Sequence, residues 1–259
     1  MELNKGLSDR VAIVTGASRG IGRAIAERLS AEGMRLVLAA RSEDALREVV
    51  ANCVTEASAF ATDLREPDAP ARLIAHAIRT FGRIDLLVNN AGATKRGDFL
   101  ELTEADWADG FALKFFSAVR CSRAAWPQLV ESAGSIINIV GIGGRTGSAE
   151  FAIGGSVNAA VLNLTKVLAD RGVGDGVRVN AINPGAIWTD RLTRRIAVAA
   201  LERGISEDDA AASMAQAMGV ARFGRPEEIA GAVAFLASPD AAYCNGAILD
   251  VDGGHTRTL

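Results

Sequence analysis

The sequence predicts a single α/β domain in which a doubly wound parallel sheet is covered by helices on both faces. Short apolar runs rich in β-branched residues alternate with longer segments of helical periodicity along the 259 residues. Hydrophobic residues make up 49% of the chain and charged residues 23%, so a full-sized core can be buried. No repeat or linker divides the sequence, and about 250 residues is a common size for one α/β domain.

The elements follow one another in a strand, helix, strand order. Seven runs fit buried strands, namely VAIVT (11–15), RLVLAA (35–40), ASAFAT (57–62), IDLLVNN (84–90), SIINIV (135–140), VRVNAI (177–182) and AILDV (247–251). Segments of helical period are expected between them at 20–32, 42–50, 68–81, 103–132, 155–171 and 226–237. The Ala-rich, charged stretch 190–220 follows a Pro-Gly pair and has weak periodicity, so we interpret it as a lid within one domain spanning 1–259.

Charge and composition exclude several classes of protein. The chain has 28 Lys+Arg and 31 Asp+Glu, a net charge of −3, which does not fit a generally basic nucleic-acid binder. No stretch approaches about 18 uninterrupted apolar residues, and the start MELNKGLSDR lacks the apolar block of a signal peptide, so we expect a cytoplasmic protein that binds no membrane. Cys53, Cys121 and Cys244 lie far apart without a CxxC pair, so we expect buried, inert thiols and no metal site.

A glycine-rich turn directly follows the first predicted strand. In TGASRGIG (15–22), Gly16, Gly20 and Gly22 precede an amphipathic helix. Glycine permits a tight turn there, and a phosphate can then approach backbone N–H groups at the helix N-terminus, where the helix dipole favours an anion. Strand-to-helix turns also use glycine without a ligand, but the position in the first strand–helix–strand unit favours a dinucleotide site.

The end of the second predicted strand bears on cofactor choice. An NAD-selective site usually has a carboxylate there for the ribose 2′-OH, whereas a 2′-phosphate requires cations. This chain has Ala40 at that position and offers Arg41 and Arg19, which can form charge-assisted bonds to a phosphate. NADP(H) is therefore favoured over NAD(H), with two solvated surface arginines as the alternative reading.

Five motifs in this order and spacing resemble those of short-chain dehydrogenases/reductases: TGASRGIG, NNAG (89–92), NPG with a later threonine (183–189), GRPEEIA (224–230) and VDGG (251–254). The match covers nearly the whole chain. It implies one Rossmann domain with seven parallel strands and a cofactor across the carboxyl ends of the strands. By the same resemblance, residues that would hold the cofactor beside the three glycines, Arg19 and Arg41 are Ser18, Ile21, Asp63, Leu64, Asn89, Asn90, Ala91, Gly92, Asn183, Pro184, Gly185 and Thr189.

The resemblance also implies a homotetramer or homodimer, built through the helices near 103–132 and 155–171 and through the last strand. An apolar stripe of helical spacing on the first of these helices agrees with that implication. It can equally pack in the core of one subunit. The stripe consists of Phe111, Phe115, Ala118, Ser122, Trp126 and Leu129.

The catalytic pattern of the family is absent from this chain. Its tyrosine, lysine, serine and asparagine positions fall on Gly154, Asn158, Gly141 and Lys114 when AAVLNLTK (159–166) and Trp107 are used as anchors. The chain has a single tyrosine, Tyr243, and no YxxxK pair, while the nearby Phe151 has no hydroxyl. Acid/base catalysis by a tyrosine is therefore not expected.

Lysine and asparagine have exchanged places relative to the family pattern. Lys114 stands where relatives have asparagine, and Asn158 stands where they have lysine, so both groups are expected near the nicotinamide. Lys114 lies in FALKFF (111–116), where desolvation can lower the pKa of its amine. The alternative is a lysine that snorkels from an apolar helix to water.

Two functional hypotheses follow. The first is an NADP(H)-dependent oxidoreductase acting on a small-molecule carbonyl or alcohol, with Lys114 and Asn158 in a rebuilt proton relay. Lys95, Arg96, Arg145 and Lys114 would form a basic set that favours an acidic substrate, although solvated loop charges explain them equally well. The second is a non-redox NADP(H)-binding protein, or a lyase- or isomerase-like enzyme that uses Lys114. An empty scaffold is disfavoured because the glycines, Asn183 and Thr189 are all present.

Overall fold

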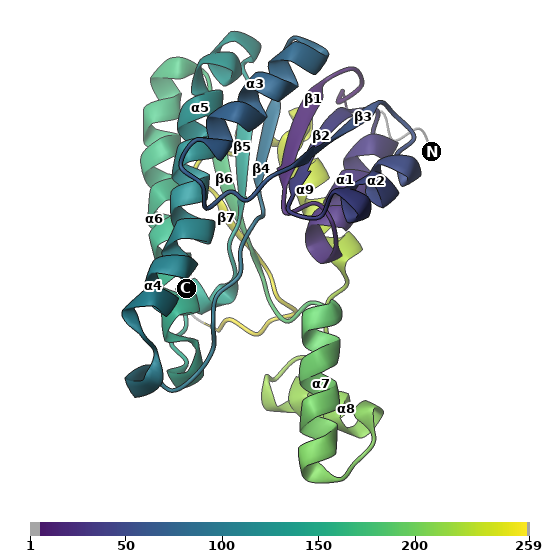
Figure 1. The fold of residues 1–259 in the computed structure, drawn as a ribbon, viewed down its shortest axis with the longest axis vertical. Helices are drawn as coiled ribbons and strands as arrows, with labels where there is room; N and C mark the ends of the chain where they lie inside the picture. The colour runs from purple at the N-terminus through teal and green to yellow at the C-terminus, as the bar shows by residue number, and fades with distance from the viewer. Residues whose placement is uncertain (1–5, 258–259) are drawn as a thin grey trace.

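A computed structural model describes residues 6–257 and contains one seven-stranded parallel sheet with helices on both faces (Figure 1). The predicted fold class is confirmed, and each predicted strand is present with ends that shift by a few residues. The sheet order is β3-β2-β1-β4-β5-β6-β7. The strands are β1 (Val11–Thr15), β2 (Arg35–Ala40), β3 (Ala57–Ala61), β4 (Leu86–Asn89), β5 (Ser135–Ile139), β6 (Arg178–Pro184) and β7 (Ile248–Val251).

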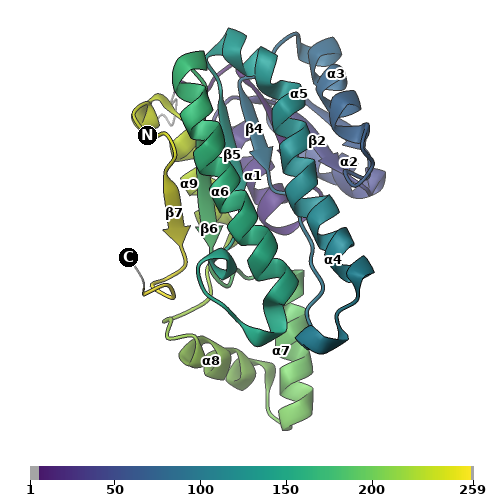
Figure 2. The same cartoon turned by 90° about the vertical axis from the view of Figure 1, so that its left-hand side faces the viewer.

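Helices α1, α2 and α9 cover one face of the sheet, and α3, α5 and α6 cover the other, with α4 extending beyond its edge (Figure 2). The helices are α1 (Gly20–Ala31), α2 (Glu43–Asn52), α3 (Ala69–Phe81), α4 (Glu104–Gly110), α5 (Ser117–Ser132), α6 (Ala152–Asp175), α7 (Asp190–Arg203), α8 (Glu207–Ala217) and α9 (Pro226–Ala237).

Alternation along the strands divides the core into two layers. Ala12, Leu36 and Leu86 pack with α1 and α9, whereas their neighbours Val37 and Leu87 pack with α3 and α5. All five are buried. A parallel strand with both faces covered must be apolar at successive positions, which explains the continuous runs in the sequence.

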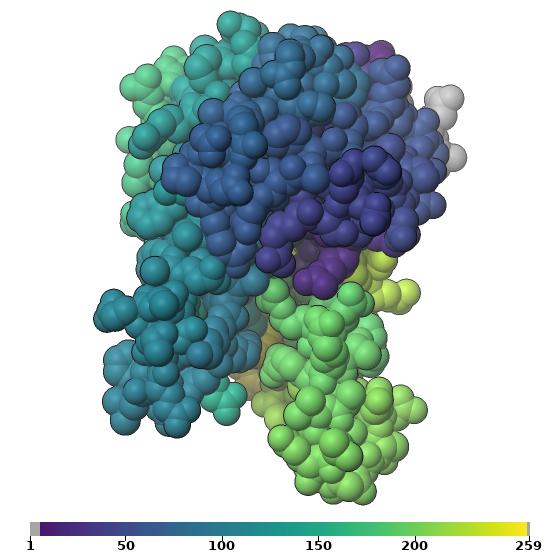
Figure 3. All heavy atoms as spheres, in the orientation of Figure 1, coloured from purple at the N-terminus to yellow at the C-terminus, as the bar shows by residue number. Residues whose placement is uncertain are grey.

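The direction in which successive parallel strands are added to the sheet reverses between β1 and β4. Strands added after β1 extend to one side through β2 and β3, and strands added after β4 extend to the other side. The loops that follow β1 and β4 therefore separate at the carboxyl ends of the strands, where a crevice forms. Figure 3 shows the surface hollowed at this end, between the side that carries α4 and the side that carries α7 and α8.

A buried polar network joins the middle of the sheet to α5 and α6. The Asn89 amide donates to Ser122 Oγ (3.2 Å) and to Asn138 Oδ1 (2.9 Å), and the Asn138 amide donates to Thr165 Oγ1 (2.9 Å). These four side chains are at most 7% exposed. Because buried polar groups are stable only when they are hydrogen-bonded, this network fixes the two helices over β4 and β5.

The segment 103–132 is not one regular helix. A π-helical segment, Phe111–Phe116, separates α4 from α5. Wider turns of this kind add a residue to the helix and often occur at functional sites. The apolar spacing in the sequence predicted the helix but not the change in its width, because both turn types place side chains i and i+4 on neighbouring positions.

The segment 190–220 consists of two regular helices, α7 and α8, instead of a loosely structured stretch. They pack on each other around Leu192, Ile196, Ala210 and Phe223, in an apolar cluster that is distinct from the two layers of the sheet. We call α7 and α8 the α7–α8 lobe. It extends beyond the carboxyl ends of the strands (Figure 1).

The apolar stripe on α5 faces the core of its own chain. Ala118, Ser122 and Leu129 are buried, and Trp126 packs against the same layer as Leu129. The α5 part of the stripe is thus core packing and does not support the predicted assembly, whereas Phe111 and Phe115 in the π-helical segment are half-buried. Phe116 in the same segment and Val167 on α6 are instead exposed (45% and 56%).

Two further expectations need qualification. Among the described residues, the helical stretch Ala149–Asp175 is long and apolar enough to span a membrane by length and composition, and its buried positions pack along β6.

Cys121 is buried, and burial raises the pKa of its thiol to about 12, as expected of an inert cysteine. Cys53 and Cys244 are only half-buried, so the expectation that all three thiols are buried was wrong. Within residues 6–257 no cluster of metal ligands is present.

The network predicts a stability effect for Asn138→Ala. The substitution removes an acceptor from Asn89 and a donor from Thr165 in the core, so the free energy of unfolding should fall by about 1–3 kcal/mol. Urea denaturation measures this change. Asn163→Ala, on the exposed side of α6, is the matched control and should leave the midpoint nearly unchanged. Equal effects of the two substitutions would contradict the role of the network.

Candidate active site

The glycine-rich turn after β1 is held against the end of β4 by hydrogen bonds. The Asn90 amide donates to Thr15 O (2.9 Å) and to Gly16 O (3.1 Å), and Thr15 Oγ1 accepts from the backbone N–H groups of Asn90 and Ala91. A Cβ on Gly16 would lie 2.9 Å from Ala91 Cα, and a Cβ on Gly22 would lie 2.2 Å from Gly16 O. Glycine is therefore required at both positions by close backbone approach.

The turn leaves the first amides of α1 without a side-chain cap. Arg19 occupies the N-cap position with an extended backbone, its side chain makes no capping bond, and no acidic residue lies in the first turn. Uncapped N–H groups beside glycines are a suitable setting for a phosphate. Ser18 and Gly20 are half-buried at this turn, whereas the side chain of Ile21 packs against the core and leaves only its backbone available.

Arg19 and Arg41 are both exposed, and neither forms an ion pair with any residue in the range 6–257. Arg41 directly follows β2, beside Ala40, whose carbonyl accepts from Thr62 N (2.8 Å). Two free guanidinium groups near a strand end without a carboxylate are the donor set that a ribose 2′-phosphate needs. The uncapped helix, the glycine cradle and these arginines together fit an NADP(H) cofactor.

Asp63 and Leu64 differ in how they fit the expected adenine pocket. Asp63 is half-buried and accepts from the backbone N–H of Arg65 (3.0 Å). Leu64 is 3% exposed, and its side chain packs in the layer that contains Leu73. The side chain of Leu64 is therefore turned into the core, and the prediction that this residue flanks the adenine rests on its backbone.

Lys114 and Asn158 meet as expected, in the π-helical segment and on α6. Lys114 Nζ donates to Asn158 Oδ1 (2.6 Å) and to the carbonyl of Val140 (2.5 Å), at the end of β5. The aliphatic stem of Lys114 packs on Gly92, where a Cβ would lie 3.0 Å from Lys114 Cδ. The ammonium is turned inward, so the alternative of a snorkelling lysine is not supported.

The environment of Lys114 lowers the pKa of its amine to about 7. Desolvation is the larger cause because it disfavours the charged form, and the guanidinium of Arg191 adds repulsion. A buried amine that titrates near neutral pH, with two fixed acceptors, can exchange a proton with a bound substrate.

Phe151 occupies the space beside Gly154, the residue that the sequence comparison with the family predicts at the tyrosine position. A Cβ on Gly154 would lie 2.0 Å from Phe151 Cζ, and a Cβ on Gly143 would lie 2.8 Å from Phe151 Cε1. The guanidinium of Arg96 stacks over the ring at 4.1 Å from its centroid. The two glycines are thus surfaces against which the aromatic ring packs.

Gly141, at the family's serine position, has a backbone that disfavours a side chain. Its φ is +135°, and a Cβ there would lie 3.1 Å from Asn158 Nδ2. Its N–H donates to Asn183 Oδ1 (3.3 Å), and the Asn183 amide in turn donates to Asp250 Oδ1 (2.8 Å). This chain of bonds links the loop after β5 to β6 and β7.

The segment that follows β6 leads from the sheet into the α7–α8 lobe. Pro184 is buried at the strand end, and a Cβ on Gly185 would lie 2.8 Å from Asp252 Cα. Thr189 precedes α7 and lies over the glycine-rich turn, because a Cβ on Gly20 would be 3.3 Å from Thr189 Cγ2. Gly16, Gly20 and Thr189, which are far apart in sequence, therefore border one crevice.

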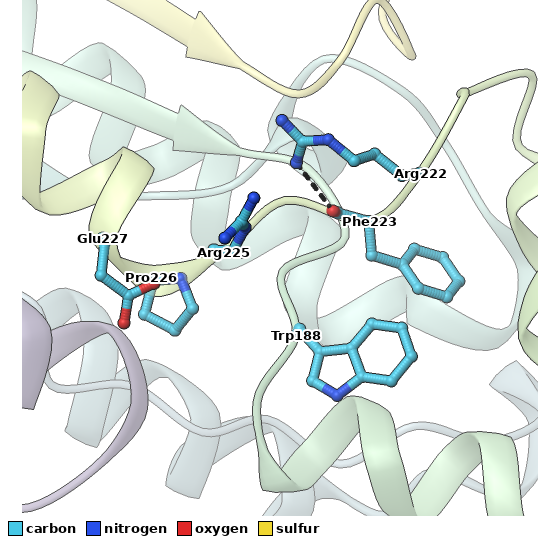
Figure 4. Close-up of a pocket in the computed structure, with 6 residues that line it drawn as sticks. All are labelled: Trp188, Arg222, Phe223, Arg225, Pro226 and Glu227. Carbon is cyan, nitrogen blue, oxygen red and sulfur yellow. Dashed lines mark hydrogen bonds between the residues drawn. The ribbon is translucent and has the colours of Figure 1, made fainter.

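A surface pocket of about 460 Å³ lies beside this connecting segment (Figure 4). The rings of Trp188 and Phe223 lie at its edge with centroids 5.6 Å apart, and Arg222 donates to the carbonyl of Phe223 (3.1 Å). The pocket is lined by none of the predicted site residues.

The predicted basic set does not assemble as expected. Lys95 pairs with Asp106 (2.9 Å) and Arg145 pairs with Asp250 (3.2 Å), so neither charge is free. The cation that acts on Lys114 comes instead from α7. It is Arg191, which donates to Gly92 O (3.4 Å) and contributes to the lowered pKa of Lys114. The sequence did carry this signal in DRLTRR (190–195), but the segment was interpreted as a loose lid.

Comparisons with known proteins agree with this architecture. A family model described as enoyl-(acyl carrier protein) reductase matches residues 16–256. The chain is 35% identical to the 3-oxoacyl-[acyl-carrier-protein] reductase of Vibrio cholerae, with 96% of this chain and 98% of that protein covered. It is 37% identical to an oxidoreductase of Mycobacterium tuberculosis, with 96% and 93% covered.

Two solved structures have the same fold with a bound cofactor. L-sorbose reductase from Gluconobacter frateurii, complexed with NADPH and L-sorbose, has a TM-score of 0.94 and 32% identity, with 99% of this chain and 100% of that chain covered. Actinorhodin polyketide ketoreductase with NADPH has a TM-score of 0.90 and 30% identity, with 96% and 98% covered.

The contact between Gly154 and Phe151 predicts a change of sign in a double-mutant cycle. Gly154→Ala alone should lower the free energy of unfolding by about 1–3 kcal/mol, because the new Cβ displaces the ring. In a Phe151→Ala background the same substitution should be neutral or stabilising, because alanine favours a helix by about 0.5–1 kcal/mol over glycine. Gly174→Ala on α6, where a Cβ meets nothing within 4 Å, is the control for that propensity effect. Thermal and urea unfolding measure the four proteins of the cycle and the control, and additive effects would refute the contact.

Proposed function

The chain belongs to the short-chain dehydrogenase/reductase family and is an oxidoreductase of that type, and from this premise we propose the details of its reaction. It transfers a hydride between NADP(H) and a carbonyl or alcohol substrate, acidic compounds included. Lys114 serves as the proton donor in place of a tyrosine, and Asn158 positions it. The observation that carries this proposal is the inward-facing Lys114, held by Asn158 Oδ1 and Val140 O at the carboxyl end of β5.

Bound NADPH supplies the hydride that reduces the carbonyl carbon. The glycine-rich turn and the uncapped amides of α1 hold its phosphates, and Arg19 and Arg41 bind the 2′-phosphate. Asn90, Ala91 and Gly92 support the cofactor from the end of β4, and Pro184, Gly185 and Thr189 border it from the end of β6. The NADPH complexes of two structures with the same fold support this choice of cofactor.

The hydrogen bonds of Lys114 suit a proton donor. An ammonium group has three N–H donors, and the two acceptors leave one for a substrate oxygen. Once Lys114 has transferred its proton to that oxygen, the neutral amine retains two N–H groups for Val140 O and Asn158 Oδ1. The side chain therefore keeps its position in both protonation states, and solvent restores the proton.

A second candidate function uses the same lysine without redox chemistry. A pKa of about 7 leaves a large fraction of Lys114 as the free amine at neutral pH. A free amine can abstract a proton or act in a lyase- or isomerase-like step, while NADP(H) remains as a structural ligand. Consumption of NADPH during turnover separates the two functions, because only the first changes the oxidation state of the cofactor.

We also propose that the protein forms a homo-oligomer. The support comes from apolar side chains that a single chain leaves exposed on α5, α6 and β7. These are Phe116, Val130, Val167, Val173 and Leu249. Burial of such residues between subunits is a usual source of association energy.

Arg41→Ala tests the cofactor assignment. Loss of a charge-assisted bond to the 2′-phosphate should weaken NADPH binding by about tenfold or more and leave NADH binding nearly unchanged. Fluorescence titration with each cofactor measures both constants. Arg47→Ala, on α2 and paired with Glu43 at the surface, is the matched control and should affect neither. Equal losses for NADPH and NADH would reject the assignment.

Lys114→Met tests the proton donor. The substitution keeps the length of the side chain but removes the proton, so kcat for carbonyl reduction should fall by about 100-fold or more. NADPH affinity and folding should persist. In the parent protein, kcat/KM for reduction should decline as pH rises through about 7, because only the protonated amine donates.

Lys166→Met is the control, because Lys166 lies on the far part of α6 and donates to Gly246 O. This variant should keep the parent activity and pH profile. Unchanged turnover in Lys114→Met would refute the proposed role of Lys114. A pH profile that lacks the decline near 7 would do the same.

A further inference from the structure

We propose that the substrate carries an anionic group, remote from its carbonyl, which Arg195 and Arg191 on α7 and Arg96 on the opposite wall of the crevice bind together. This inference rests on the proposed function, because it assigns the anion to the molecule that Lys114 serves. It names the substrate class as carbonyl compounds with a carboxylate or phosphate, the two oxyanions that an arginine fork matches.

One wall of this anion site is a face of α7. Arg191 and Arg195 are four residues apart and share one side of the helix, whereas Leu192 and Ile196 turn into the core of the α7–α8 lobe. Arg191 reaches the body of the protein, where it donates to Gly92 O. Gly92 is also the residue on which the stem of Lys114 packs. The arginine face of α7 is therefore directed toward the reacting end of the crevice.

The opposite wall lies on the loops that follow β4 and β5. A cavity of about 450 Å³ is lined by Arg96, Gly97, Asp98, Phe99, Ala149 and Glu150. Arg96 is held in place by its stack on Phe151, the ring that fills the family's tyrosine position. A ligand in this cavity would thus contact Arg96 close to the ring of Phe151.

The two walls are close enough to act on each other. The pKa of Arg96 is lowered, by desolvation first and then by Arg195, with Arg191 contributing further, while Glu150 opposes these effects. The pKa of Arg191 is lowered by desolvation and by Arg19 and Arg194. A continuous group of cations therefore extends from the glycine-rich turn to the cavity at Arg96.

The arginines of this group form no ion pairs. Within residues 6–257, none of Arg19, Arg96, Arg191, Arg194 and Arg195 is in a salt bridge, although twelve other salt bridges are present. Acidic residues do lie nearby: Asp98 and Glu150 line the same cavity as Arg96, and Asp190 precedes Arg191. Like charges that face one another across a crevice repel, and an anion between them removes that repulsion.

The cofactor accounts for one end of the group only. Arg19 belongs to the glycine-rich turn, where the phosphates of NADP(H) are expected, and Arg191 lies between the two ends. Arg96 lies with Phe151 and Glu150, and Arg195 acts on it from α7, at the end of the group away from the glycine-rich turn. The charges at this second end are therefore assigned to the substrate.

Matched ketones test the substrate class with the NADPH-saturated enzyme. The pair 4-oxopentanoate and its methyl ester tests a carboxylate. Acetoacetyl-CoA and the acetoacetyl thioester of N-acetylcysteamine test a phosphate. Arg195→Gln should lower kcat/KM about tenfold or more for at least one charged member and leave both neutral members unchanged. Arg195→Lys should retain part of the activity, because it keeps the charge but loses the fork.

Arg203→Gln is the matched control, because it removes the same charge from the same helix. Arg203 instead donates to Ser213 Oγ within the α7–α8 lobe. It should leave all four reactions unchanged. NADPH affinity should be the same in the parent and in all three variants.

A binding experiment tests the site without turnover. Malonate and inorganic pyrophosphate are titrated into the NADP⁺-saturated protein, and tryptophan fluorescence is followed, since Trp188 is 47% exposed at the base of α7. At least one anion should bind, and Arg195→Gln should weaken it about tenfold where Arg203→Gln does not.

The outcomes separate the two proposals. Reduction of the neutral and charged ketones with equal efficiency, unaffected by Arg195→Gln, would overturn the anion site and leave the oxidoreductase intact. No oxidation of NADPH with any ketone, together with Arg195-dependent binding of malonate or pyrophosphate, would overturn the proposed reaction and leave the anion site. Loss of NADPH binding in Arg195→Gln would reassign the arginine to the cofactor and overturn the inference.

Discussion

The hydrogen bonds between Thr15 and Asn90 are the constraint on which the rest of the site depends. They join β1 to β4, the two strands between which the direction of strand addition reverses, and they satisfy polar groups on both strand ends. The glycine-rich turn on one side and the loop that supports Lys114 on the other are both anchored there. A change at this junction would move the phosphate-binding amides and the reacting end together.

The side chains around Lys114 and Gly154 fit one another closely. With a phenylalanine ring packed on Gly154, no side chain can project from that position, and the positive φ of Gly141 disfavours a serine. Lys114 enters from the other side, through the π-helical segment, and Asn158 receives it at hydrogen-bonding distance. Gly154 and Gly141 are thus each accounted for by local packing and backbone geometry, and Lys114 and Asn158 by their mutual hydrogen bond.

The sequence predicted the sheet well, because burial on both faces requires continuous apolar runs. It also predicted the glycine-rich turn, because close backbone contacts there exclude a Cβ. It also placed Lys114 and Asn158 together. The π-helical segment, the position of Phe151 and the direction of Leu64 were not predicted, because each depends on side-chain packing that periodicity does not encode. The arginine face of α7 was missed for another reason: Leu192, Ile196 and Ala200 have helical spacing, but frequent alanines and charges obscured it.

The α7–α8 lobe has its own apolar core. The segments that connect it to the sheet pair with each other in one parallel β-bridge, between Ile187 and Gly224. The stability of the lobe is therefore only partly shared with that of the sheet, and the lobe can open without exposure of the central strands. In evolutionary terms, the arginine face of α7 lies in a module separate from the scaffold that carries the glycine-rich turn. Substitutions on α7 can therefore accumulate with little effect on the sheet, and the two parts of the molecule can diverge at different rates.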